Sequence, residues 1–65
     1  MIEFTEREQE VLNLLKQGLS NKEISTTLCI SMHTTKIHVA SVYKKLGATN
    51  RVQALVKYFN LDIES

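Results

Sequence analysis

The stretch Ser20–Leu46, SNKEISTTLCISMHTTKIHVASVYKKL, decides the fold of this chain. Ser20 and Glu23 form a capping box, in which the serine hydroxyl accepts from the glutamate amide and the glutamate carboxylate accepts from the serine amide. Ser31 is a second N-cap, and the segment Cys29–Ser31 that leads to it is too short to be a free loop. Two helices joined by such a tight turn form a helix-turn-helix unit, which is the prediction for this stretch.

A further helix is predicted upstream of this unit. Thr5 and Glu8 form another capping box, and the helix then runs to about Gln17. Gly18 follows, in a position to end the helix in a left-handed cap. The apolar stripe of this helix consists of Val11, Leu12, Leu14 and Leu15.

A fourth helix is predicted downstream. The third helix covers residues 32–46 and stops at Gly47, and either Thr49 or Asn50 caps the next one. The fourth helix has apolar surface at Val52, Leu55, Val56 and Phe59. Three aromatic residues are expected to complete the core: Tyr43, Tyr58 and Phe59. The sequence therefore predicts an all-α fold of four helices that forms one domain over residues 1–65.

The third helix has two contrasting sides. On a wheel at about 100° per residue, the side expected to face the core carries Thr35, Val39, Val42 and Leu46. The opposite side carries His33, Ile37, Ala40, Ser41 and Lys44, with Lys36 at its edge. Ile37 points directly away from the core, where a solvated helix usually has a long polar residue. A single exposed apolar residue is common, but Ile37 and Ala40 are suited to contact thymine methyl groups.

The polar residues of this region have roles that follow from their reach. Lys36 is placed to bond guanine O6 and N7 or a phosphate, and His33 is placed to bond a base or a phosphate. Phosphate contact is expected for Thr34, Lys44 and Lys45, and for the helix start at Asn21 and Lys22. A solvated charge is the simpler interpretation of any one lysine, so the prediction depends on their joint arrangement.

The distribution of charge agrees with this interpretation, although the net charge is only +1. No acidic residue occurs between Glu23 and Asp62, and the basic residues in that stretch are Lys36, Lys44, Lys45, Arg51 and Lys57. A stretch of one sign is typical of a protein that binds a polyanion. An ordinary solvated face explains the same charges equally well.

Three motifs carry a family resemblance: FTEREQEVLNLLKQGLSNKEIS, IS-x-x-T-x-K-x-H-V and KLGATNRVQALV. With these motifs in this order, the chain resembles the LuxR/GerE-type helix-turn-helix family, which includes the output domains of NarL/FixJ-type response regulators. The resemblance implies a bacterial transcription regulator of four helices. Its third helix is the recognition helix, which enters the major groove of double-stranded DNA, and its fourth helix commonly pairs two domains.

The resemblance also implies roles for individual residues. It implies base contacts at Lys36, Ile37 and Ala40, and backbone contacts at Asn21, Lys22, Thr34, His38 and Lys44. His38 lies nearer the core edge of the wheel, so a packed, half-buried histidine is an equal alternative for it. Thr35 stands where the family usually has valine, which should slightly weaken the packing under the recognition helix. Ala40 is short where some relatives carry a long donor, so an A·T-leaning or shape-dependent target is expected.

Four residues of the fourth helix share a side that need not face the core: Gln53, Val56, Lys57 and Asn60. Val56 in this set would seed a symmetric contact between two copies, as the resemblance implies. The alternative is that Val56 packs inward. The prediction is a homodimer on DNA whose recognition helices address half-sites about one helical turn apart.

Other classes of function receive little support. Cys29, His33 and His38 lack a nearby fourth ligand, so neither a metal site nor a cofactor is expected, and Cys29 is predicted to be a small buried hydrophobe. Nucleophile, base and orienting group do not occur together, so an enzyme is not predicted. The lone cysteine and the lack of a membrane-spanning apolar run indicate the reducing cytoplasm, where the protein would be associated with the nucleoid. The main alternative is a sigma-factor-like interaction module that docks on RNA polymerase or another regulator.

Overall fold

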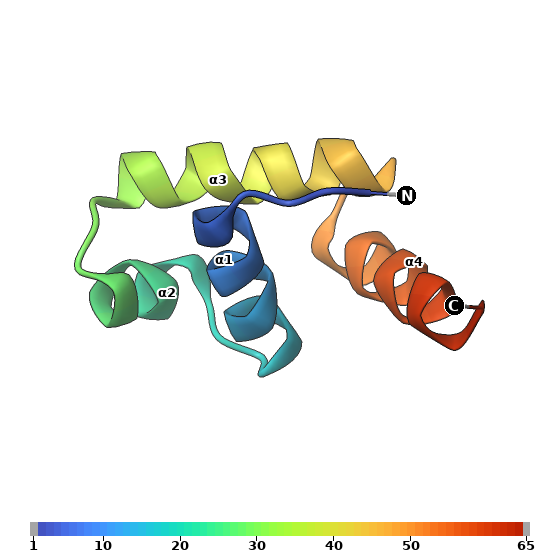
Figure 1. Cartoon of the computed structure of the whole chain (residues 1–65). Helices are drawn as coiled ribbons and strands as arrows, with labels where there is room; N and C mark the ends of the chain where they lie inside the picture. Colours follow the sequence, from blue (N-terminus) through green and yellow to red (C-terminus); the bar gives the residue numbers. More distant parts are fainter. Residues whose placement is uncertain (1, 65) are drawn as a thin grey trace.

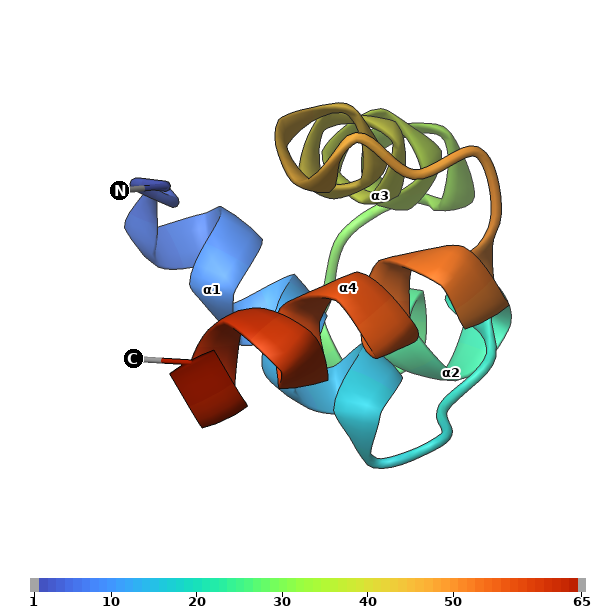
Figure 2. The same ribbon diagram turned by 90° about the vertical axis from the view of Figure 1, so that its right-hand side faces the viewer.

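The computed structural model describes the backbone of residues 2–64 and the side chains of residues 2–60. Four helices follow one another in this part of the chain: α1 (Glu6–Lys16), α2 (Asn21–Leu28), α3 (Met32–Leu46) and α4 (Arg51–Glu64). No strand occurs among residues 2–64, so the prediction of an all-α fold is confirmed. The long helix α3 runs along one side of the molecule, and the other three helices all lie on the same side of α3, beneath it in the view (Figures 1 and 2).

The predicted helix starts are confirmed. Both capping boxes are complete: the Glu8 carboxylate accepts from the Thr5 amide at 2.8 Å, and the Glu23 carboxylate accepts from the Ser20 amide at 2.8 Å. The Ser31 hydroxyl accepts from the Thr34 amide at 3.0 Å at the start of α3. Each of these bonds satisfies an amide that would otherwise have no partner within the helix.

Asn50 is the residue that caps α4. Its side-chain oxygen accepts from the Gln53 amide at 2.9 Å. The Gln53 side chain reaches back and accepts from the Thr49 amide at 3.0 Å and from the Thr49 hydroxyl at 2.9 Å. Thr49 therefore supports the cap from one position upstream, and the choice between the two residues that the sequence left open falls to Asn50.

The first three helices end in the same way, with a Schellman motif. A residue in the left-handed region ends each helix: Gly18 (φ 90°), Cys29 (φ 58°) and Gly47 (φ 68°). The following amide then bonds a carbonyl five residues back, in the pairs Leu19–Leu14, Ile30–Ser25 and Ala48–Tyr43. Glycine meets this requirement without a steric penalty, whereas a residue with a Cβ is strained by about 1–2 kcal/mol.

Cys29 is therefore a correction to the sequence prediction. It was expected to be a small buried hydrophobe, but its side chain is exposed. The reason is its position at the end of α2, where the left-handed backbone directs the chain into the turn toward Ser31. Residue type alone predicts burial for cysteine, and the place of Cys29 in a Schellman motif overrides that preference.

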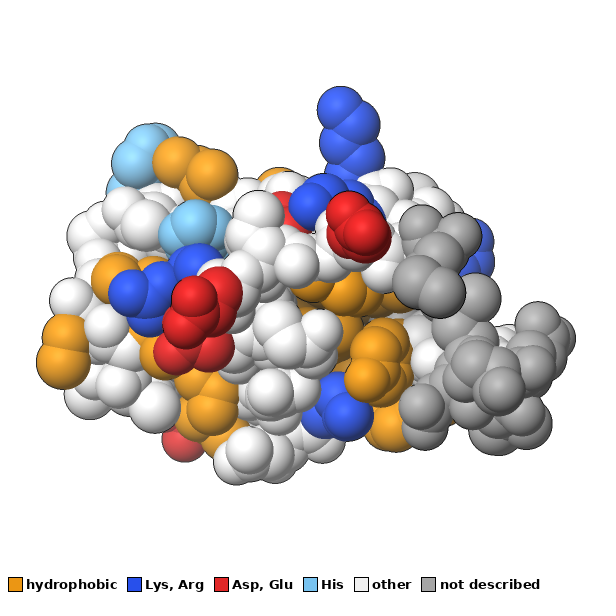
Figure 3. All heavy atoms as spheres, viewed as in Figure 1, with side chains coloured by type: hydrophobic (Ala, Val, Ile, Leu, Met, Phe, Trp, Pro, Cys, Tyr) orange, Lys and Arg blue, Asp and Glu red, His pale blue; other side chains and the backbone are white. Residues whose placement is uncertain are grey.

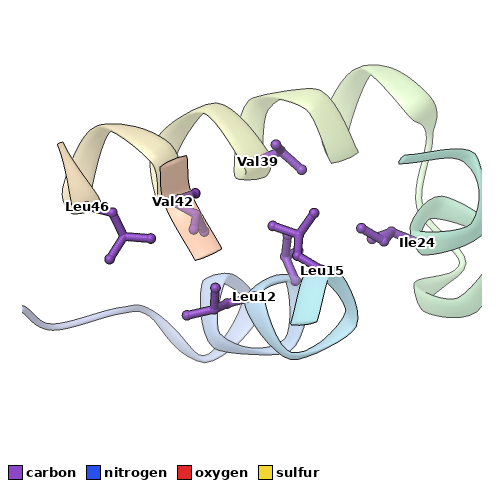
Figure 4. Close-up of a cluster of buried hydrophobic side chains, with 8 residues drawn as sticks. Leu12, Leu15, Ile24, Val39, Val42 and Leu46 are labelled. Carbon is purple, nitrogen blue, oxygen red and sulfur yellow. The ribbon is translucent and has the colours of Figure 1, made fainter. Parts of the chain in front are cut away.

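The core lies between α3 and the other three helices, as Figure 4 shows for six of its side chains. Its fully or nearly fully buried members are Val11, Leu12, Leu15, Ile24, Val39, Val42, Leu46 and Ala54. Burial of a single side chain of this size contributes about 1.5–3 kcal/mol. Because these residues come from all four helices, the orientation of α3 is fixed by the same contacts that stabilise the domain.

The aromatic residues follow the prediction only in part. Tyr43 and Tyr58 are half-buried and pack against the core. Phe59 was predicted to do the same, but 44% of it is exposed. Ala54 marks the buried side of α4, and Phe59 lies about 140° from it on a wheel with about 100° per residue. The prediction for Phe59 was wrong because α4 turns this side away from the core.

Three contacts fix α4 against its neighbours. The Arg51 guanidinium donates to the carbonyl of Leu15 at 3.0 Å, in the last turn of α1. The Lys57 ammonium donates to the carbonyl of Gly47 at 2.5 Å, where α3 ends. The Lys16 ammonium lies 4.6 Å from the centre of the Tyr58 ring, within the range of a cation–π contact.

Candidate nucleic-acid interface

The turn between α2 and α3 is held by hydrogen bonds on both sides. The Ile30 amide donates to the Ser25 carbonyl at 3.0 Å, and the Ser31 cap begins α3 directly afterwards. The Ser25 hydroxyl, which is mostly buried, lies 2.7 Å from the Lys22 carbonyl and 3.5 Å from the Met32 sulfur. These contacts, with the packing of α2 on α3, hold α3 in one orientation.

The two sides of α3 differ as the helical wheel predicted, with Ser41 as an exception. Thr35, Val39, Val42 and Leu46 are buried. The four residues predicted to contact bases are all exposed: His33, Lys36, Ile37 and Ala40. Figure 3 shows histidine and hydrophobic side chains that project beyond the outer edge of the N-terminal half of α3. The candidate base-reading surface, defined as these four residues, is therefore free of contact with the core.

Thr35 lies on the opposite, buried side of α3, and its hydroxyl has a hydrogen-bond partner there. It is fully buried, and its hydroxyl donates to the Ser31 carbonyl at 2.9 Å. A buried hydroxyl without a partner would cost about 1–3 kcal/mol. The expected slight loss of packing relative to valine stays a prediction, but the cost of an unsatisfied hydroxyl is avoided.

The residues predicted to contact phosphates lie at two places. Asn21 and Lys22 form the first turn of α2, where Lys22 is exposed and Asn21 is half-buried. On α3, Lys44 is exposed, while Thr34 and His38 are half-buried. The half-burial of His38 agrees with the alternative of a packed histidine, and its contact with a phosphate stays a prediction.

A carboxylate lies beside the first turn of α2. The Ser20 amide donates to the Glu23 carboxylate, and the Ser20 hydroxyl accepts from the Glu23 amide. The bond from the Ser20 amide, followed by the interaction with the Ser20 side chain, lowers the pKa of Glu23. Glu23 is therefore ionised at neutral pH. The positive charge of Arg51 also lowers the pKa of Glu23, and the neighbouring Lys22 is exposed.

Ser41 lies elsewhere than predicted, and Lys45, whose contact with a phosphate stays a prediction, has partners within the chain. Lys45 was predicted to contact a phosphate, but its ammonium lies 2.5 Å from a carboxylate oxygen of Glu8 and 3.0 Å from the carbonyl of Glu3. Ser41, placed on the outward side by the wheel, is half-buried and donates to the other carboxylate oxygen of Glu8. The start of α1 covers this part of α3, which a wheel drawn for α3 alone does not include.

Glu8 is the residue with the most extensive role that the sequence did not indicate. Its carboxylate is buried, caps α1 through the Thr5 amide, and binds two side chains of α3. The hydrogen bond from Lys45, followed by those from Ser41 and Thr5, lowers the pKa of Glu8 to about 2. The capping box predicted its local bond, but its partners on α3 are more than thirty residues away.

The exposed side of α4 is more apolar than predicted. Val52, Val56 and Phe59, here called the α4 stripe, are exposed by 71%, 53% and 44%. The four residues predicted to pair two domains, Gln53, Val56, Lys57 and Asn60, are also exposed. Exposure of Val56 excludes the alternative that it packs inward. Gln53 and Lys57 already have partners within the chain, at Thr49 and Gly47.

The described residues give two further observations. No group of three or more His, Cys, Asp or Glu side chains in the described residues is arranged to hold a metal ion. Within the same part of the chain, every helix is too short or too polar to cross a lipid bilayer.

Comparison with known proteins extends these observations. The family described as "Bacterial regulatory proteins, luxR family" matches residues 3–58. The nitrate/nitrite response regulator protein NarP of Escherichia coli is 46% identical over 55 residues, which are 85% of this chain and 26% of that protein. The CsgBAC operon transcriptional regulatory protein of Escherichia coli is 47% identical over 52 residues, which are 80% of this chain and 24% of that protein.

Two solved structures resemble the fold closely. The response regulator ChrA of a heme-sensing two-component system superposes with a TM-score of 0.86 and 38% identity, over 92% of this chain and 30% of that one. The transcription factor GerE superposes with a TM-score of 0.78 and 37% identity, over 91% of this chain and 88% of that one. The chain thus spans about a quarter of the length of the curated relatives it matches, but most of GerE.

Proposed function

Because the chain belongs to the luxR family of bacterial regulatory proteins, we propose that it binds specific sites in double-stranded DNA and thereby regulates transcription. The observation that carries the proposal is the outer side of α3. His33, Lys36 and Ile37 are exposed there, while the opposite side of the same helix forms the core. A rigid helix with an exposed, partly basic side fits the major groove of B-DNA.

Lys36 and its neighbours read the bases in this proposal. Lys36 donates to guanine O6 and N7, and His33 donates to a base edge near the start of the helix. Ile37 and Ala40 lie one turn apart on the same side and contact the apolar parts of the bases. The exposure of all four side chains supports this arrangement, since none is used by the core.

Phosphate contacts set the orientation of the domain on the duplex. The amides of Asn21 and Lys22 lie in the first turn of α2, where the helix dipole favours an anion. The Lys22 ammonium adds a positive charge that Glu23 partly offsets. Lys44 is the exposed cation late in α3 and completes the phosphate contacts from the other end of the helix.

The domain forms a homodimer on DNA through α4. The α4 stripe supports this proposal, because three exposed apolar side chains at positions i, i+4 and i+7 form one ridge along a helix. Three residues bury a small area, so the dimer is weak in solution and forms when two copies occupy adjacent half-sites. Asn60 lies beyond the stripe on the exposed surface and borders the contact.

Docking on RNA polymerase or another regulator, as in a sigma-factor-like module, is the second candidate. The same helix-turn-helix unit would serve such a contact, and no described residue argues for it specifically. It predicts retention of a protein partner in the absence of DNA. The two candidates therefore differ in a binding experiment with purified components.

Equilibrium binding of the chain to a mixed pool of duplex DNA, measured at several salt concentrations, tests the proposal. We expect the logarithm of the observed association constant to fall linearly with the logarithm of the salt concentration, with a slope of about −0.9 per neutralised phosphate. Rounds of selection from the same pool should then yield a site with two-fold symmetry. Binding without a salt slope, or no enrichment of any sequence, would contradict the proposal.

A further inference from the structure

The candidate base-reading surface combines polar and apolar chemistry in an unusual way. The apolar part of this surface consists of Ile37, which is 54% exposed, and of Ala40, which is exposed one turn later. Neither side chain has a donor or an acceptor, so neither can take part in hydrogen-bond readout. The hydrogen-bonding groups of the surface belong to the other two residues, Lys36 and His33.

An aliphatic side chain in the major groove can gain from only one feature of the base edges. The C5-methyl group of thymine is the apolar group that a base pair presents there. Cytosine carries a hydrogen at the same carbon, and 5-methylcytosine carries the methyl. Thymine and 5-methylcytosine differ next to that methyl, with an O4 acceptor in one and an N4 donor in the other. Ile37 makes no hydrogen bond to either group, because it has no polar atom.

No carboxylate of α3 favours the cytosine amine over the thymine carbonyl. A carboxylate is the side chain that accepts from the cytosine N4 donor, and α3 contains no acidic residue. The nearest carboxylate in contact with α3 is that of Glu8, which is buried against Ser41 and Lys45 in the C-terminal half of the helix. No acceptor with a negative charge therefore stands beside Ile37 to select for or against the exocyclic amine.

We infer that this surface reads C5-methyl groups as such, so that it accepts 5-methylcytosine in place of thymine and responds to methylation of cytosine in its site. The inference rests on the proposed function and specifies the ligand chemistry of the same surface. When one base methyl group contacts Ile37, apolar surface about the size of that methyl group is removed from water. This burial corresponds to about a fourfold change in affinity.

The test uses the selected duplex and chemically modified bases. Replacing thymine by uracil removes the methyl and nothing else from the base. We expect about a fourfold loss of affinity at one or two thymines in each half-site and no loss elsewhere. At the same positions, a pair with 5-methylcytosine should bind about fourfold more tightly than the same pair with cytosine.

The variant Ile37→Ala assigns the effect to its residue. It should fold as the parent does by circular dichroism, because Ile37 does not contribute to the core, and it should lose both the uracil penalty and the gain from 5-methylcytosine. Ile2→Ala makes the same change at an exposed position upstream of α1, outside both proposed binding surfaces, and it should keep both effects.

The outcomes separate the inference from the proposed function. Binding to the selected site with no response to either modified base overturns the inference and leaves the proposed function intact. A response that persists in Ile37→Ala also overturns it, since the methyl is then read elsewhere. Failure to bind any duplex overturns the proposed function, and the inference with it.

Discussion

The ammonium of Lys45 lies 2.5 Å from a carboxylate oxygen of Glu8, and this ion pair joins the first turn of α1 to the last turn of α3. Glu8 is buried and also accepts from the Thr5 amide and the Ser41 hydroxyl. A buried carboxylate is stable only when such partners compensate for its lost hydration. The pair therefore holds one end of α3, and in the free chain the Lys45 ammonium already has an anionic partner.

This network predicts how stability depends on pH. The pKa of Glu8 is about 2 in the folded chain, mainly because Lys45 donates to it, and lies near the ordinary value of 4.5 when the chain unfolds. A lowered folded-state pKa stabilises the fold above the unfolded value, and the contribution disappears as the pH falls toward 2. The difference in unfolding free energy between the parent and Glu8→Gln should therefore shrink between about pH 4.5 and pH 2.

Chemical denaturation at a series of pH values measures this difference. Glu10→Gln is the matched control, since Glu10 is an exposed carboxylate on the same helix. Its difference from the parent should change much less over the same interval. If the difference in unfolding free energy between the parent and Glu8→Gln stays constant with pH, the ionised form of Glu8 does not stabilise the folded state.

The left-handed residue at the end of α2 gives a second prediction. Cys29 has φ 58°, and Cys29→Gly relieves the strain of a Cβ in this region while it adds freedom to the unfolded chain. The net expectation is a gain of up to about 1 kcal/mol in the free energy of unfolding, or several degrees in Tm. Cys29→Val, which is β-branched, should lose about 1 kcal/mol or more. Thermal denaturation under reducing conditions checks both, and equal stabilities would refute the argument from backbone strain.

A third prediction separates base contacts from phosphate contacts. Lys36→Ala should weaken binding to the selected site by about 1–3 kcal/mol and binding to random duplexes by much less. Lys44→Ala, a change of the same kind later on α3, should weaken both equally and reduce the salt slope by about one. Fluorescence titrations of the two variants against both kinds of duplex provide the measurement. An equal loss on both duplexes for Lys36→Ala would place Lys36 on the backbone.

A fourth prediction concerns the α4 stripe. Val56→Asp places a charge at the centre of the proposed contact between two copies, where burial would require its desolvation. We expect loss of cooperative binding to a site with two half-sites and unchanged binding to a single half-site. Because Val56 is exposed, the thermal stability of the isolated chain should change by less than about 0.5 kcal/mol.

Asn13→Asp adds the same charge on the exposed surface of α1 and should keep cooperative binding intact. Band-shift experiments on paired and single half-sites distinguish the two variants. If Val56→Asp binds the paired site as cooperatively as the parent, α4 is not the surface through which copies meet.

The local features of the fold could be predicted from the sequence, because they depend on residues close together in the chain. The caps at Thr5, Ser20 and Ser31 connect residues three positions apart, and all three are present. The buried side of α3 followed from its periodicity for the same reason. The prediction of its exposed side was correct at Lys36 and Ile37, where no other helix covers α3.

The errors occur where helices that are distant in the sequence meet. The positions of Ser41 and Lys45 depend on the start of α1, and a wheel of α3 contains no information on that contact. Phe59 was assigned to the core because it is aromatic, but the buried side of α4 is set by Ala54, whose small size lets the helix approach. The predicted contacts with bases and phosphates depend on a ligand, so they remain predictions until DNA binding is measured.

The hydrogen bond from Arg51 to Leu15 has a consequence for cooperativity. The Arg51 guanidinium, at the first residue of α4, adds a second hydrogen bond to the Leu15 carbonyl, which also accepts from the Gly18 amide, and Ala54 enters the core one turn later. Fraying of α4 would therefore deprive α1 of a terminal bond and open the hydrophobic cluster on which α3 rests. We therefore expect α3 and α4 to unfold as one unit, so that association at the proposed α4 contact would protect the proposed base-reading surface against local unfolding.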